Sequence, residues 1–163
     1  MAVSTYKTYL LAQGSTGDIY KLPDIKDYSD LDGEPELLET TTLANSRQTN
    51  IKGIQSSEGH TFTMNYSLAD YTVLKALADS GKAFYFYVPF DYNGTSSYGS
   101  DGGVKYKGTC NIQRTGKGVN EVREMVFTVY DVGDSTDILS AVTCSSTLSS
   151  SNVSTLIGNG MPV

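Results

Sequence analysis

The sequence is poor in the side chains that build metal sites and redox centres. Its 163 residues include one histidine, two cysteines and no tryptophan. A structural zinc site needs about four nitrogen or sulfur ligands, so these residues do not predict one. Cys110 and Cys144 are expected to be small buried hydrophobic residues, with a disulfide between them as the alternative.

Long apolar runs are also missing from the sequence. No run is long enough to span a bilayer. The apolar patch from Tyr9 to Ala12 is too short for the core of a secretory signal. We therefore expect a protein that is made in the cytoplasm and has no membrane segment.

Residues suited to catalysis are scarce. A nucleophile needs a base and an orienting group, but His60 stands at the start of a predicted strand, where an ordinary surface or edge residue is expected. The acidic stretch 27–39 partly imitates a calcium loop, although its spacing does not match an EF-hand. The sequence therefore predicts no enzyme, no cofactor and no metal.

The charge balance argues against specific nucleic-acid binding. The formal net charge is −6, and the lysines and arginines form no basic stripe. An acidic surface repels phosphates rather than neutralising them. The same balance suits a surface past which DNA slides without sticking.

Alternation and turn residues predict a chain made mostly of strands. Gly116 and Gly118 are expected to supply the positive φ of a tight turn, and apolar residues on both faces of the strand after it predict that both faces are covered. The strands are expected at 6–12, 18–25, 60–66, 83–90, 104–114 and 119–130.

One helix is predicted, over residues 68–79. Ser67 is a suitable N-cap, Asp70 completes a variant of the capping box, and Gly81 follows as a stop. The apolar face is expected to comprise Leu68, Tyr71, Leu74, Leu77 and Ala78.

Two segments lack such periodicity. Residues 27–59 form a long excursion with too much apolar content for a linker. We expect an arm that becomes ordered on a neighbouring subunit, with an excursion folded on its own core as the alternative. Residues 138–163 contain a short strand candidate and a serine-rich stretch that is expected to be flexible. The predicted division is therefore a β domain over 1–137, including the arm, followed by 138–163.

A pattern of spaced positions runs through residues 35–77. It comprises Pro35, Leu37, Glu39, Thr41 and Leu43, then Ile51, Gly53 and Ile54, then the strand from Phe62 to Tyr66. With this pattern, residues 35–77 resemble the major tail tube proteins of long-tailed, siphovirus-like bacteriophages. Similarity in the order of elements extends over about residues 1–135.

This resemblance implies a mainly β (α+β) fold, an antiparallel β-sandwich or half-barrel with one flanking helix and a long loop arm. It implies a virion subunit that forms hexameric rings, which stack into a tail tube for genome ejection. Tape measure, tail terminator and baseplate proteins are the implied partners, and DNA passes through the lumen without specific binding. The arm residues expected at the subunit interface are Pro35, Leu37, Leu38, Leu43, Arg47, Ile51 and Ile54.

Two other functions remain open from the sequence. Another phage head–tail β subunit, such as a tail terminator or decoration protein, would form a ring or trimer without polymerising. A carbohydrate-binding or adhesin module would use some of the twelve tyrosines to line a glycan groove. The absence of tryptophan argues against the latter.

Overall fold

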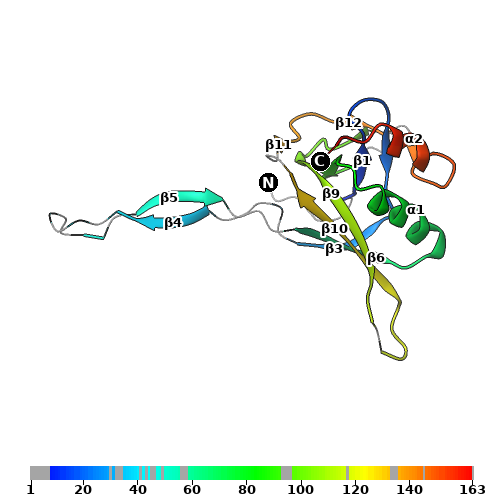
Figure 1. Cartoon of the computed structure of the whole chain (residues 1–163), viewed down its shortest axis with the longest axis horizontal. Coiled ribbons are helices and arrows are strands. Elements are labelled where there is room, and N and C mark those ends of the chain that lie inside the picture. Colours follow the sequence, from blue (N-terminus) through cyan, green and yellow to red (C-terminus); the bar gives the residue numbers. More distant parts are fainter. Residues whose placement is uncertain are drawn as a thin grey trace.

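The chain folds mostly into β-strands around one mixed sheet, with helices on one side (Figure 1). The computed structural model describes residues 8–29, 31, 35–40, 42, 44, 47–48, 50–55, 59–92, 97–116, 118–132, 136–144 and 146–162. Within them the elements are β1 Leu11–Gln13, β2 Ile19–Lys21, β3 Ile25–Tyr28, β4 Pro35–Glu39, β5 Asn50–Gln55, β6 His60–Asn65, α1 Leu68–Asp79, β7 Phe84–Pro89, β8 Ser97–Tyr98, β9 Gly103–Arg114, β10 Glu124–Asp131, β11 Thr136–Asp137, β12 Val142–Thr143, β13 Ser146–Thr147 and α2 Val153–Gly158.

The main sheet of the described residues has nine strands and is open. Its order is β13-β2-β1-β7-β9-β10-β6-β3, and β11 pairs with β9 beside this path. Every pair is antiparallel except β13 with β2. The predicted fold class is confirmed, because an open β sheet with flanking helices is consistent with a half-barrel. The parallel strand and the second helix were not predicted.

The core lies between the helices and one face of this sheet. Alternate residues of β6 and β10 point into it, so that Phe62, Met64 and Phe127 are fully buried. The predicted cover on both faces of β10 is wrong for the single chain. Val126 and Thr128 are half-buried and Tyr130 is exposed, because the helices cover only the opposite face.

Helix α1 begins and ends where it was predicted. Its N-cap is Ser67, but the side chain makes no capping hydrogen bond, and Gly81 follows with a φ of +66°. The predicted apolar face is partly wrong. Leu68 is 69% exposed, whereas Val73 is buried with Leu74 and Leu77, because the first turn extends past the edge of the core.

Both predicted hairpins are present. Strands β1 and β2 pair antiparallel, as do β9 and β10. The second turn is longer than expected, since β10 begins at Glu124. Its positive φ, +69°, belongs to Asn120 and not to Gly116 or Gly118. Asparagine tolerates this conformation better than most side chains, which corrects the prediction.

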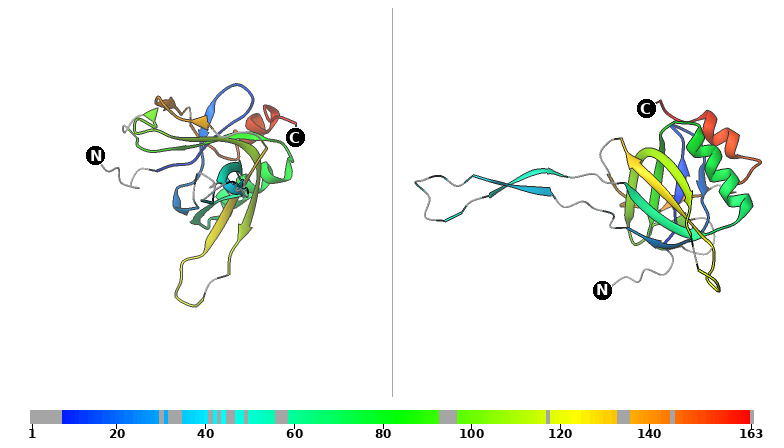
Figure 2. Two further views of the ribbon diagram at one scale, coloured as in Figure 1. Left: turned by 90° about the vertical axis from the view of Figure 1, so that its left-hand side faces the viewer. Right: turned by 60° about the horizontal axis from the view of Figure 1, so that its bottom comes forward.

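Residues after 137 pack against the body of the domain. Strand β12 pairs with β8, and β13 adds to the main sheet beside β2. Leu148 and Leu156 are buried in the main core, and α2 lies beside α1 (Figure 2). The serine-rich composition predicted flexibility, but two well-spaced leucines are sufficient to attach this segment. The division of the chain at residue 137 stays a prediction.

The two cysteines are free thiols on opposite faces of the sheet. Cys110 belongs to the main core and Cys144 to a smaller cluster with Leu11, Tyr87 and Tyr98. Burial raises the pKa of Cys110 to about 12 and also raises the pKa of Cys144. Their predicted role as small buried hydrophobic residues is confirmed.

Candidate assembly interface

The predicted arm contains a two-stranded antiparallel ribbon that extends away from the body (Figure 1). It consists of β4 and β5, which the sequence did not predict because neither strand shows a sustained period. The body also claims the first residues of the predicted arm, since β3 runs to Tyr28 and pairs with β6.

Most of the predicted interface residues lie on this ribbon. Leu38 is opposite Ile51, and Leu37 is opposite Lys52. Pro35 also belongs to β4 and Ile54 to β5, while Arg47 is exposed between the two strands. Leu43 lies outside the described residues. The register thus brings the two halves of the predicted set together, although their role at an interface stays a prediction.

Among the ribbon side chains that the structure describes, Leu38 is a large hydrophobic residue with 46% of its surface accessible. An isolated two-stranded ribbon is marginally stable in water, because it has no third strand and no packed face. Exposed apolar area on such a ribbon favours contact with another surface.

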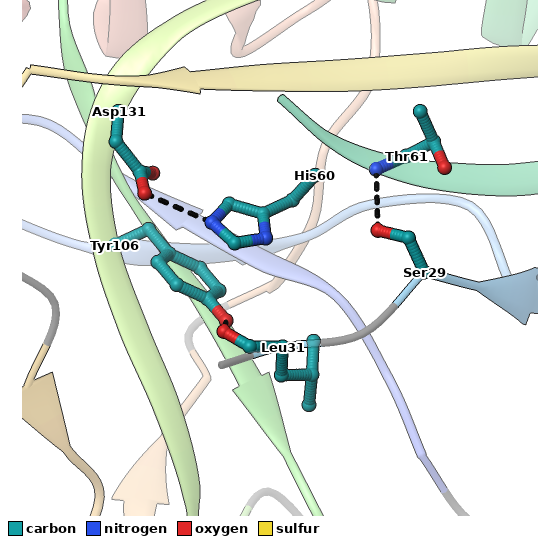
Figure 3. Close-up of polar contacts among 6 residues, drawn as sticks. All are labelled: Ser29, Leu31, His60, Thr61, Tyr106 and Asp131. Atoms are coloured by element: carbon teal, nitrogen blue, oxygen red, sulfur yellow. Dashed lines mark hydrogen bonds and ion pairs between the residues drawn. The ribbon is translucent and has the colours of Figure 1, made fainter. Parts of the chain in front are cut away.

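The start and end of the arm are tied together at its base (Figure 3). The Ser29 amide donates to the Thr61 carbonyl over 3.0 Å, and the Thr61 amide donates to Ser29 Oγ over 3.0 Å. The Tyr106 hydroxyl, from β9, donates to the Leu31 carbonyl. These bonds fix the two ends of the arm side by side on the sheet.

His60 lies at the same place and is not the ordinary surface residue that was predicted. It is 7% exposed, its Nε2 is 2.9 Å from Asp131 Oδ2, and its ring stacks on Tyr106 at 4.0 Å (Figure 3). Alternation along β6 explains this burial, since His60 shares a face with Phe62 and Met64. The same alternation could have placed it inward from the sequence. We interpret the cluster as a support for the arm, because its contacts join the arm base to β9 and β10.

The ends of the main sheet are a second candidate surface. In the part of the chain that the structure describes, β3 and β13 each pair on one side only. Such strands present backbone groups that can pair with another chain. Exposed Lys26 and Asp27 on β3 limit indiscriminate pairing, and Lys26 Nζ lies 2.9 Å from Glu124 Oε2.

The described residues include no group of three or more histidine, cysteine or acidic residues that could hold a metal. Within the same ranges, no helix has the length and apolar character needed to cross a membrane.

Several solved structures share this fold. One is a chain from the structure of the PVC sheath/tube terminator of an extracellular contractile injection system in its extended state, with a TM-score of 0.60, 10% identity, and coverage of 84% of this chain and 96% of that one. A chain from the baseplate of the anti-feeding prophage gives 0.57 and 9%, with 85% and 96% covered. The tail tube of SPP1 gives 0.57 and 16%, with 84% and 79% covered.

At the level of sequence, no curated protein matches the chain. A family model does match, that of the phage tail tube protein, TTP, over residues 12–93. The matched residues run from β1 through the arm, α1 and β7, and they make up half of the chain. The chain therefore belongs to the phage tail tube protein family and is a structural component of a phage tail.

Proposed function

We propose that copies of this chain close into hexameric rings, and that the rings stack into the tail tube through which the phage genome is ejected. The observation that carries this proposal is the β4–β5 ribbon. It extends from the body with Leu38 exposed, and in the described part of the chain its two strands pair only with each other. A second copy supplies a surface on which the ribbon packs.

The open sheet supports ring formation. When β3 of one copy lies beside β13 of the next, the sheets continue from subunit to subunit and the exposed edges disappear. The half-exposed face of β10, with Val126, Thr128 and Tyr130, is a further surface available to a neighbouring copy. Tape measure, terminator and baseplate proteins would meet the tube at its interior and its two ends.

Passage of DNA needs a lumen that does not retain it. A formal charge of −6 for each copy gives an assembled tube a strongly acidic total. Such a tube disfavours the phosphate contacts on which non-specific DNA binding depends. In this proposal, the subunit is made in the host cytoplasm and functions in the virion tail, without an enzymatic activity.

Electron microscopy of the purified protein tests the proposal. Negative-stain images over a range of concentrations, with the tail-assembly initiator added where needed, should show six-fold rings and stacked tubes. A protein that remains monomeric under every condition would contradict the proposal.

A second candidate is a tail terminator that forms one ring and stops. The similarity to a chain from the PVC sheath/tube terminator structure favours it, since that chain is covered over 96% of its length. The same images separate the two candidates, because a terminator gives discrete single rings at all concentrations, whereas a tube subunit gives stacks whose length varies.

A further inference from the structure

The acidity of this chain is concentrated in the sequence that leads from β3 to the end of β4. Residues 27–39 contain six acidic side chains and no basic one, which equals the whole formal net charge of −6. The rest of the chain is therefore balanced. Within the described part of this segment, Leu38 and Glu39 are both exposed, and their side chains point to opposite faces of β4 because successive residues of a strand alternate. The arm thus offers an apolar side chain on one face and a carboxylate on the other.

The turn between β9 and β10 has the opposite character. Residues 114–123, RTGKGVNEVR, contain three basic residues and one acidic residue. Val119 is 92% exposed and Val122 is 63% exposed. These two apolar residues lie next to Arg114 and Arg123 on the same turn, so the turn combines exposed apolar area with positive charge.

An open groove of about 350 Å³ lies at this turn. Its carboxylates already have partners inside the chain. Glu124 pairs with Lys26 over 2.9 Å, and the Gly118 amide donates to Glu121 over 3.2 Å. The groove is lined by Tyr66, Arg114, Thr115, Gly118, Val119, Glu121, Arg123 and Glu124.

The two arginines of the groove differ from its carboxylates in this respect. Among the described residues, neither Arg114 nor Arg123 forms an ion pair. The Arg114 guanidinium lies 4.6 Å from the centre of the Tyr71 ring, which orients it and leaves its N–H groups able to donate. Two arginines beside a groove are well suited to carboxylates, which they bind in a bidentate manner.

The arm and the turn lie apart in the structure of one copy. They leave the body in different directions, as both views in Figure 2 show. A contact between them therefore joins different surfaces of two copies. Such head-to-tail contacts generate a closed ring or a continuing stack, depending on the rotation between copies.

We propose that the β9–β10 turn receives the acidic arm of a second copy. Arg114 and Arg123 pair with arm carboxylates, and Val119 and Val122 cover Leu38. This inference rests on the proposed function, because it assigns a receiving surface to the arm, but its test does not require complete rings.

Cross-linking between copies tests the contact directly. A tagged Leu38→Cys chain is mixed with an untagged Val119→Cys chain, oxidised, and separated on a non-reducing gel, where the tag identifies the mixed dimer. Leu139→Cys is the matched control, because Leu139 is 91% exposed and Val119 is 92% exposed. We expect about tenfold more mixed dimer with Val119→Cys than with Leu139→Cys. Equal yields for the two partners would overturn the inference.

Charge exchange then tests the chemistry of the contact. Glu39→Arg is placed in the Leu38→Cys chain and Arg123→Glu in the Val119→Cys chain. Either change alone should lower the cross-linking yield about tenfold, and the two together should restore most of it. Lys75→Glu, at an exposed position on α1, is the control and should leave the yield unchanged. A loss that the combination does not restore would contradict the proposed pairing.

The two proposals fail in different ways. Rings in the microscope without preferential cross-linking at Val119 would remove the docking surface and leave the tail tube function intact. Preferential cross-linking by a protein that never forms rings would retain the contact and remove the ring.

Discussion

Two hairpins of this molecule have the same antiparallel connectivity but differ in burial. β9 and β10 lie inside the nine-stranded sheet, and one face of β10 buries Met125, Phe127 and Val129. In the described structure, β4 and β5 pair only with each other, and Leu38 stays exposed. The first hairpin is stabilised by burial inside the subunit. The second presents exposed apolar area that a partner can cover.

This difference indicates which residues can affect assembly without affecting the folding of the subunit. Burial in the body provides the free energy that holds the subunit together, so changes there should unfold it. Changes on the arm should leave the subunit folded and weaken its association. The polar cluster around His60 lies between these two regions.

The largest loss of subunit stability is expected from Phe127→Ala. Phe127 is fully buried, and its ring centre is 5.5 Å from that of Phe86. Truncation should lower the free energy of unfolding by about 3–5 kcal/mol. Urea denaturation followed by circular dichroism measures it, and a loss below about 1 kcal/mol would show that the core lies elsewhere.

His60→Ala should have the next largest effect. The change removes the partner of Asp131 Oδ2 and the ring that stacks on Tyr106, at an expected cost of about 2–3 kcal/mol. His60→Gln is the matched control, because its amide can still donate to the carboxylate. Equal losses for both variants in the same denaturation experiment would contradict a role for the hydrogen bond.

Tyr106→Phe separates the arm base from the core. The ring remains, and only the hydroxyl that donates to the Leu31 carbonyl is lost, which should cost about 1 kcal/mol. We expect faster amide hydrogen exchange at Ser29 and Thr61, because these residues hold the base of the arm together. Unchanged exchange at both amides would show that the tyrosine does not support the arm.

Leu38→Ser should have the smallest effect on the subunit. Because Leu38 is already exposed, the free energy of unfolding should change by no more than about 0.5 kcal/mol. Association, measured by light scattering, should weaken. Leu139→Ser, also at an exposed leucine, should change neither quantity. Equal association by the Leu38 and Leu139 variants would show that the arm contributes no more to association than other exposed parts of the surface.

The elements predictable from sequence were those whose neighbours along the chain specify them. Alternation of Phe62 and Met64 predicted β6, and the spacing of Leu74 and Leu77 predicted α1. Gly81 correctly marked the end of the helix. These patterns report which face of an element is apolar, and burial follows from that face.

The remainder depends on contacts between residues distant in sequence. Helix α2 has six residues, and its attachment depends on Leu156 reaching the main core. The β4–β5 ribbon depends on a register that no alternation indicates. His60 was assigned to a surface or edge position because it stands at the start of a strand, and no local pattern indicated its contact with Asp131, which is 71 residues away. Candidate arm residues could be named from the resemblance, whereas the polar base that supports the arm could not.

Deletion of residues 34–52 tests the central claim most directly, since it removes the arm and keeps the sheet. Thermal unfolding should show a folded subunit, and negative-stain microscopy should show that stacked tubes, present for the intact chain, are lost. Normal tubes from the shortened chain would contradict the assignment of assembly to the arm.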